Sequence, residues 1–202
     1  GLGTAFMVYL LGRRYFDETA GVLAALFLGL SPMYVFYSRT VQPDATALFF
    51  AVVALYFFLR WLESARWGDY IAATFMAMLA FLTKIPSLYM GFPLLYAAWR
   101  KYGWRMWREW RIWLFGIVAL APALLYYLYA HGLYRQTGLT VYGITGGWPG
   151  SGKFDNLGQL LSVDFYRAMF IRFRSIILGN YGLLLLALGL ALAPRWKEEG
   201  VF

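Results

Sequence analysis

The sequence predicts an all-α membrane protein, a polytopic bundle of about six to seven transmembrane helices with a long outer loop that carries an interfacial helix. Three observations predict this class. The 202-residue chain is 61% hydrophobic and 14% charged, whereas a soluble domain carries about 25% charged residues. Its mean hydropathy is +0.57. Apolar runs of helical length recur, and the cations gather at their ends, as in chains that span a bilayer.

The expected spans follow from uncharged runs, because a spanning helix needs about 20 predominantly apolar residues. The opening stretch, GLGTAFMVYLLGRR, is typical of the second half of a span, so we expect a fragment whose first helix lies upstream. The shorter runs can still span if flanking Lys and Arg side chains extend to the interface. Pro86 and Pro93 predict a bend in one run. The runs are 19–38, 45–59, 70–83, 85–99, 112–134 and 175–194.

Orientation is predicted from the cations, which favour short cytoplasmic turns. If every run spans, one side holds eleven of the eighteen Lys and Arg residues and is expected to be cytoplasmic. On this side Trp and Arg each recur every three residues in 104–113, which we interpret as an interfacial helix. The other side carries a long loop, about 131–174, whose second half, 160–174, predicts an amphipathic helix on the membrane.

Composition excludes several classes of function. The chain has no cysteine, so disulfides and thiolate metal sites are excluded, and a single histidine excludes a multi-histidine metal cluster. The net charge of +8 does not indicate a nucleic-acid partner, because the cations flank apolar runs and form no polar stripe. His131 lies where an expected span ends. His131 could face lipid headgroups at the membrane interface, or it could bind substrate, because imidazole is suited to proton transfer.

The stretch YSRTVQPDATALFF, residues 37–50, places two charges between apolar runs. Arg39 and Asp44 share the outer side with Lys84, and intramembrane charge indicates function. The cations suit a phosphate group. Purely structural roles are equally possible for both residues. Asp44 follows Pro43 and could be a carboxylate that stabilises the start of a helix, and Lys84 could anchor the end of a helix at the interface.

The motifs around this turn resemble a known family. In order they are a GRR-F turn, LSP, YSR, PDA and LTK-P, and they cover residues 5–100 well. The chain resembles the polytopic glycosyltransferases of the C superfamily, in the bacterial protein-mannosyltransferase and aminoarabinose-transferase-like branch. The resemblance implies one transmembrane glycosyltransferase domain over 1–202, without its first helix and first outer loop. It also implies integral placement in a bacterial or archaeal plasma membrane, with the active site outside.

The resemblance further implies a polyprenyl-phosphate-linked sugar donor and a lipid, glycan or protein acceptor. Lys84 matches the family's lysine that faces the donor phosphate, and Arg39 matches the basic residue before the acidic position of Asp44. Arg39, Tyr37, Gln42 and His131 are further substrate-binding candidates. Asp44 is the catalytic candidate, although the family's acidic base lies in a loop upstream of Gly1. Asp44 would then orient the site, bind the acceptor or help to hold a divalent cation, Mg or Mn. Where the family has Gly after the lysine, this chain has Ile85.

Two rival classes use the same charges. A transporter or flippase of an anionic lipid or solute would also need outer cations, but it predicts interrupted helices paired between two related halves. The sequence shows no such pairing. A purely structural membrane subunit is the other rival. Sugar, acceptor and oligomeric state cannot be derived from the residues.

Overall fold

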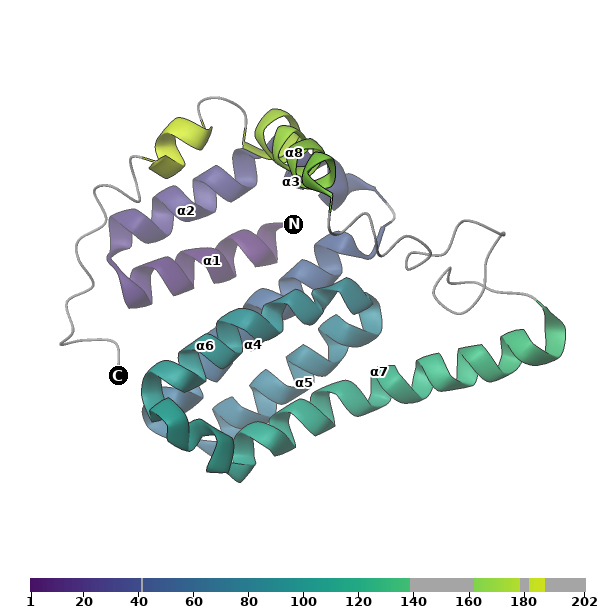
Figure 1. Ribbon diagram of the computed structural model, residues 1–202. Helices are drawn as coiled ribbons and strands as arrows, with labels where there is room; N and C mark the ends of the chain where they lie inside the picture. Colours follow the sequence, from purple (N-terminus) through teal and green to yellow (C-terminus); the bar gives the residue numbers. More distant parts are fainter. Residues whose placement is uncertain (41, 139–161, 179–181, 188–202) are drawn as a thin grey trace. The chain divides into compact units, whose positions relative to one another are not determined.

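The computed structural model describes residues 1–40, 42–138, 162–178 and 182–187, and these residues form helices and short connections without a strand (Figure 1). The described residues divide into two compact units, one within Gly1–Ala123 and one within Leu124–Trp196. The predicted all-α class is therefore confirmed for the described part of the chain.

The first unit is built around one long helix, α4, on which α1, α3, α5 and α6 all pack. Helix α7 begins in this unit and continues into the second one. The elements are α1 (Leu2–Tyr15), α2 (Glu18–Leu30), α3 (Pro32–Arg39), α4 (Asp44–Ser64), α5 (Trp67–Thr83), the 3₁₀ helix η1 (Ile85–Met90), α6 (Gly91–Tyr102), the 3₁₀ helix η2 (Gly103–Arg108) and α7 (Trp110–Thr137).

The second unit contains the rest of α7, α8 (Val163–Arg172), the π-helix η4 (Phe173–Leu178) and a helical segment at 182–187. The helix predicted within 160–174 is confirmed as α8. The first half of the outer loop and most of the expected span 175–194 lie outside the described residues.

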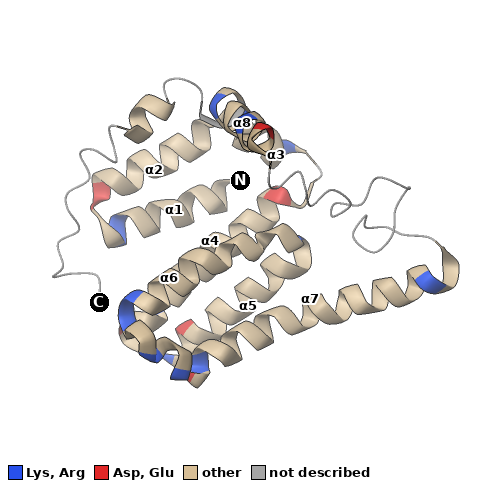
Figure 2. Ribbon diagram, viewed as in Figure 1, with Lys and Arg blue, Asp and Glu red and all other residues tan. Residues whose placement is uncertain are grey.

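Two described helices, α4 and α7, are long and apolar enough to cross a membrane, each with a mean hydropathy of 1.9. The bent pair α2 and α3 makes a third if it counts as one span. Helix α5 is apolar but has only 17 residues. Figure 2 shows the charged residues of α1, α4, α5 and α6 near the helix ends and none in their middles. This distribution agrees with a membrane protein, and two or three of the expected six to seven spans are recognised by length within the described residues.

The run 19–38, expected as one spanning helix, forms two helices, because the chain breaks at Ser31 and bends by 63°. Pro32 has no amide hydrogen to donate to Leu28, and a proline disfavours helical geometry in the residue before it. Ser31 is accordingly extended, with φ −61° and ψ 119°. The bend predicted in 85–99 is present as η1, which carries Pro86 in its first turn and precedes α6.

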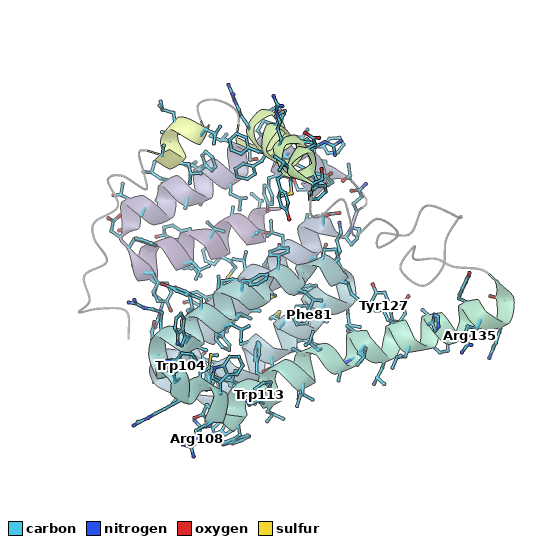
Figure 3. The ribbon with its side chains drawn as sticks, viewed as in Figure 1. Phe81, Trp104, Arg108, Trp113, Tyr127 and Arg135 are labelled. Carbon is cyan, nitrogen blue, oxygen red and sulfur yellow. The ribbon has the colours of Figure 1, made fainter. Side chains whose placement is uncertain are left out.

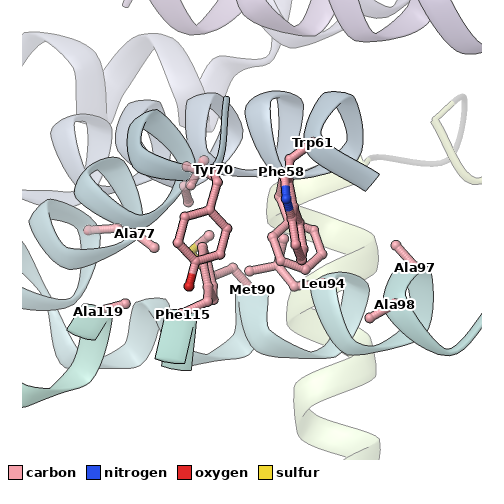
Figure 4. Packing of buried hydrophobic residues seen from close by; sticks show 14 of the residues in the cluster. Phe58, Trp61, Tyr70, Ala77, Met90, Leu94, Ala97, Ala98, Phe115 and Ala119 are labelled. Atoms are coloured by element: carbon pink, nitrogen blue, oxygen red, sulfur yellow. The ribbon is translucent and has the colours of Figure 1, made fainter. Parts of the chain in front are cut away.

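The core of the first unit lies between α4, α5, α6 and α7. Buried alanines recur at i, i+4 and i+7 on the two helices of the central pair, and such small residues let helices approach closely. Toward the far end of α4, Phe58 packs against Phe115 with ring centroids 4.9 Å apart, and Trp61 packs on Tyr70 at 5.1 Å (Figure 4). The alanines are Ala47, Ala51 and Ala54 on α4 and Ala73, Ala77 and Ala80 on α5.

Helices α1 and α2 form a hairpin that depends on two facing glycines. A Cβ on Gly12 would lie 2.6 Å from the Cα of Gly21, and a Cβ on Gly21 would lie 2.7 Å from the carbonyl oxygen of Tyr9. Asp17 begins α2 by accepting a hydrogen bond from the amide of Ala20 at 2.7 Å. The backbones are thus too close to admit a side chain at either glycine.

We predict that Gly21→Ala destabilises the protein by about 1–3 kcal/mol, the usual cost of overpacking a tight interface. The matched control is Gly29→Ala on the same helix, where an added Cβ meets nothing within 4 Å. That control should be neutral or stabilising, because alanine favours helix more than glycine does. Thermal unfolding in detergent micelles, followed by circular dichroism, measures both. Equal stability of the two variants would contradict the close α1–α2 contact.

Candidate active site

Asp44 and Lys84 meet because α4 and α5 run antiparallel. Asp44 is the first residue of α4, and Lys84 is the C-cap of α5, so the start of one helix lies beside the end of the other. The ammonium of Lys84 forms an ion pair with the carboxylate of Asp44. Each charge also complements the dipole of its own helix. The sequence-based expectation that these two residues lie at one level is confirmed.

The pair is partly open to its surroundings. The side chain of Lys84 is 37% exposed and that of Asp44 is 34% exposed. Tyr89 on η1 lies close enough to interact electrostatically with both charges. A negatively charged group can therefore reach the lysine without unfolding the hairpin.

A pocket of about 350 Å³ lies at the same end of α4. Its walls come from the starts of α1 and α4 and from the end of α3 with the turn that follows it. The lining is rich in hydroxyl and amide groups and includes two aromatic rings, a combination that suits hydrogen bonding and stacking with a sugar. The side chains that supply these groups are Tyr37, Ser38, Thr40, Gln42, Thr46 and Phe49.

The structure unites some of the predicted site residues and leaves others apart. Tyr37 and Gln42 both line the pocket. Arg39 ends α3 as an exposed residue, and within the described residues no ion pair or hydrogen bond joins it to Asp44 or Lys84. His131 is exposed on the part of α7 that belongs to the second unit, and its role in substrate binding stays a prediction.

Sequence reasoning missed the contribution of α1 to the pocket. Gly1 and Gly3 line it, and a Cβ on Gly3 would lie 2.9 Å from the ring of Phe49. Tyr34 also donates a hydrogen bond to the carbonyl of Gly1, which ties α3 to α1. A glycine in an apolar helix was the available signal, because it allows another element to approach closely.

The described residues do not form a metal site. No three His, Asp or Glu side chains in the described ranges are placed to hold an ion. The carboxylate of Asp44, which could contribute one ligand, already forms an ion pair with Lys84.

The opposite end of α4 is strongly basic and carries a second set of ion pairs. Arg14 pairs with Glu63, which fixes α1 to α4, and Arg60 pairs with Asp69 at 3.3 Å, which fixes α4 to α5. Because α4 has 21 residues, the two ends lie about 30 Å apart, close to the thickness of a bilayer's hydrocarbon core. We call them the Asp44 end and the basic end.

Fold and charge distribution define an integral membrane protein with polar groups at both ends of an apolar bundle. Residues 1–129 match the family described as dolichyl-phosphate-mannose-protein mannosyltransferase. The chain belongs to this family of membrane glycosyltransferases, which confirms the resemblance read from the motifs.

One curated relative is YkcB of Bacillus subtilis (strain 168), whose name describes it as a candidate mannosyltransferase. It is 29% identical over 93 residues, which is 46% of this chain and 13% of the relative. The match thus covers about an eighth of the relative's length. No solved structure matches the chain significantly.

We predict that Asp44 and Lys84 are energetically coupled. Asp44→Asn and Lys84→Gln each leave an unpaired charge, so the double variant should lose less stability than the sum of the two single losses. The coupling should be up to about 1 kcal/mol, as for partly exposed ion pairs. Unfolding of the four proteins in detergent micelles measures it. Losses that add without coupling would show that the ion pair does not form.

Proposed function

We propose that the chain is the part of a glycosyltransferase that transfers a sugar from a polyprenyl-phosphate-linked donor to a lipid, glycan or protein acceptor at the outer membrane face. The observation that carries the proposal is the juxtaposition of a lysine–carboxylate pair and a hydroxyl-lined pocket at one end of α4, in a member of a mannosyltransferase family. A bacterial or archaeal plasma membrane is the proposed setting.

The chemistry of this reaction needs a cation at the donor. The bond between the anomeric carbon of the sugar and the phosphate oxygen breaks, and the lipid phosphate leaves with the electron pair. The acceptor hydroxyl forms the new bond to that carbon and gives its proton to a base. A positioned ammonium stabilises the charge that grows on the leaving oxygen, and it does so best where water is scarce.

Lys84 is the residue we assign to the donor phosphate. Its ion pair with Asp44 holds the ammonium at the mouth of the α4–α5 hairpin, and about a third of its side chain stays accessible. Arg39, exposed at the end of α3, is assigned to the same phosphate. Arginine can hold two phosphate oxygens through its planar fork, whereas lysine acts as a point charge.

Asp44 is assigned to the acceptor side of the site. In the absence of donor, the ion pair with Asp44 holds the side chain of Lys84 in place. When the donor phosphate binds Lys84, the carboxylate of Asp44 is free to accept a hydrogen bond from the acceptor hydroxyl. Tyr37 and Gln42 are assigned to the sugar hydroxyls, because both line the pocket. His131 as a substrate-binding residue and a divalent cation as cofactor stay predictions from the resemblance.

The test is turnover of polyprenyl-phosphate-mannose by the full-length protein in membranes that hold its native acceptors, followed as release of polyprenyl phosphate. Lys84→Gln should lower kcat by about 10²–10³-fold, as loss of a positioned charge at a leaving oxygen does. Lys84→Arg should keep part of the activity, because it preserves the charge. Asp44→Asn should also reduce turnover.

The matched control is Glu63→Gln, the same change of carboxylate to amide in the interhelical ion pair at the basic end. It should keep kcat near the wild-type value. Wild-type turnover by Lys84→Gln would contradict the role of the lysine. Movement of the donor across the membrane without sugar transfer would contradict the enzyme proposal. It would favour a transporter or flippase, which could use the same charges.

A further inference from the structure

An apolar groove lies at the basic end of the first unit, outside the site proposed for sugar transfer. Its volume is about 320 Å³. Buried Met106 closes its floor, while Trp104 is 80% exposed at its rim. The lining residues are Leu95, Tyr96 and Trp99 of α6, and Trp104, Met106 and Trp107 of η2.

The local backbone explains why aromatic and cationic residues form separate rows here. Helix α6 ends at Gly103, whose φ of 55° suits glycine, and the chain continues as a 3₁₀ helix. In a 3₁₀ helix side chains three residues apart eclipse each other. Trp104 therefore lies in register with Trp107, and Arg105 with Arg108, on neighbouring faces. The expectation of one helix over 104–113 is wrong, because Glu109 has an extended backbone and separates η2 from α7.

The aromatic wall of the groove, which consists of Trp99, Trp104 and Trp107, is held in place in the free protein by a contact with α7. The indole N–H of Trp113 on α7 donates to the carbonyl oxygen of Trp107 at 3.0 Å, and the two rings lie 5.9 Å apart. Figure 3 shows Trp104, Trp113 and Arg108 at this end, with the Arg108 side chain directed outward. A fixed groove costs less conformational entropy on binding than a flexible surface.

The arginines beside the groove differ from the other arginines of the basic end. Arg14, Arg60 and Arg111 each have a carboxylate partner. Arg105 and Arg108 are exposed and have no acidic partner among the described residues, and the same holds for Arg100 at the end of α6.

Lys101 is less suited than these arginines to an external anion. Burial lowers the pKa of Lys101, although Glu63 and Glu109 partly oppose this effect. The two carboxylates already lie near its ammonium, so an added phosphate would meet negative charge there.

We propose that the groove binds one anionic phospholipid, with an acyl chain against Trp99, Trp104 and Trp107 and the phosphate on Arg105 and Arg108. Charge complementarity selects this occupant, because unpaired guanidinium groups favour phosphate and border an exposed aromatic wall. In a bilayer that wall contacts acyl chains near the headgroup level, where Trp side chains are enriched. The proposal is independent of sugar transfer.

The test uses tryptophan fluorescence of the whole chain in phosphatidylcholine vesicles that contain a minority of brominated phosphatidylglycerol. Quenching should exceed that caused by the same fraction of brominated phosphatidylcholine. In the double variant Arg105→Gln/Arg108→Gln the excess should disappear, with each change weakening the relative affinity by about fivefold. Arg105→Lys/Arg108→Lys should keep part of the excess, because it retains charge but loses the planar fork.

The matched control is Arg13→Gln/Arg66→Gln, which removes the same charge from two exposed arginines near the same end that, unlike Arg105 and Arg108, are not adjacent in sequence to any residue lining the groove. It should keep the excess. Equal quenching by the two brominated lipids in the wild-type chain would overturn the proposal. So would equal losses in both Gln double variants, which would indicate general surface charge. Removal of the excess by inorganic phosphate, but not by chloride at the same ionic strength, would also overturn it in favour of a simple anion site.

Discussion

The antiparallel contact between α4 and α5 is the interaction on which the first unit depends. Small buried residues, among them Ala54, Ala73 and Ala77, are fully covered and let the two helices approach closely. An ion pair closes the hairpin at each end, Asp44 with Lys84 and Arg60 with Asp69. Helices α1, α3 and α6 then pack on α4. If α4 and α5 separated, the ion pair of the candidate active site would break, and the helices that form the pocket and the groove would lose a stable surface to pack on.

Charge has a different role at the two ends of α4. At the Asp44 end one lysine is paired yet accessible, next to a pocket lined by hydroxyl groups, which suits a substrate that arrives with its own phosphate. At the basic end some arginines hold helices together, while Arg105 and Arg108 have no acidic partner in the described part of the chain and lie beside aromatic rings. Under the proposed function this asymmetry has a meaning, because a glycosyltransferase that uses a lipid-linked sugar would have to hold both its substrate and its place in the bilayer.

Much of this arrangement follows from local sequence. The approach of Asp44 to Lys84 was predictable, because two apolar runs joined by a short turn must form an antiparallel hairpin. The break at Ser31 does not follow from the length of the uncharged run, because it depends on Pro32, which lacks an amide hydrogen. The three-residue spacing of Trp and Arg in 104–113 predicts a helix, but this spacing fits a 3₁₀ helix better than an α-helix. The part of the pocket that α1 supplies depends on contacts between distant segments, which no local pattern reports.

The central claim is that the Asp44 end faces the outside and the basic end faces the cytoplasm. The chain has no native cysteine, so single cysteines can report their own side of the membrane. Gln42→Cys and Arg105→Cys, both at exposed positions, serve this purpose in intact cells treated with a membrane-impermeant thiol reagent. The account predicts labelling of Gln42→Cys in intact cells, and of Arg105→Cys only after the membrane is permeabilised. The reverse pattern, or labelling of both variants in intact cells, would contradict it.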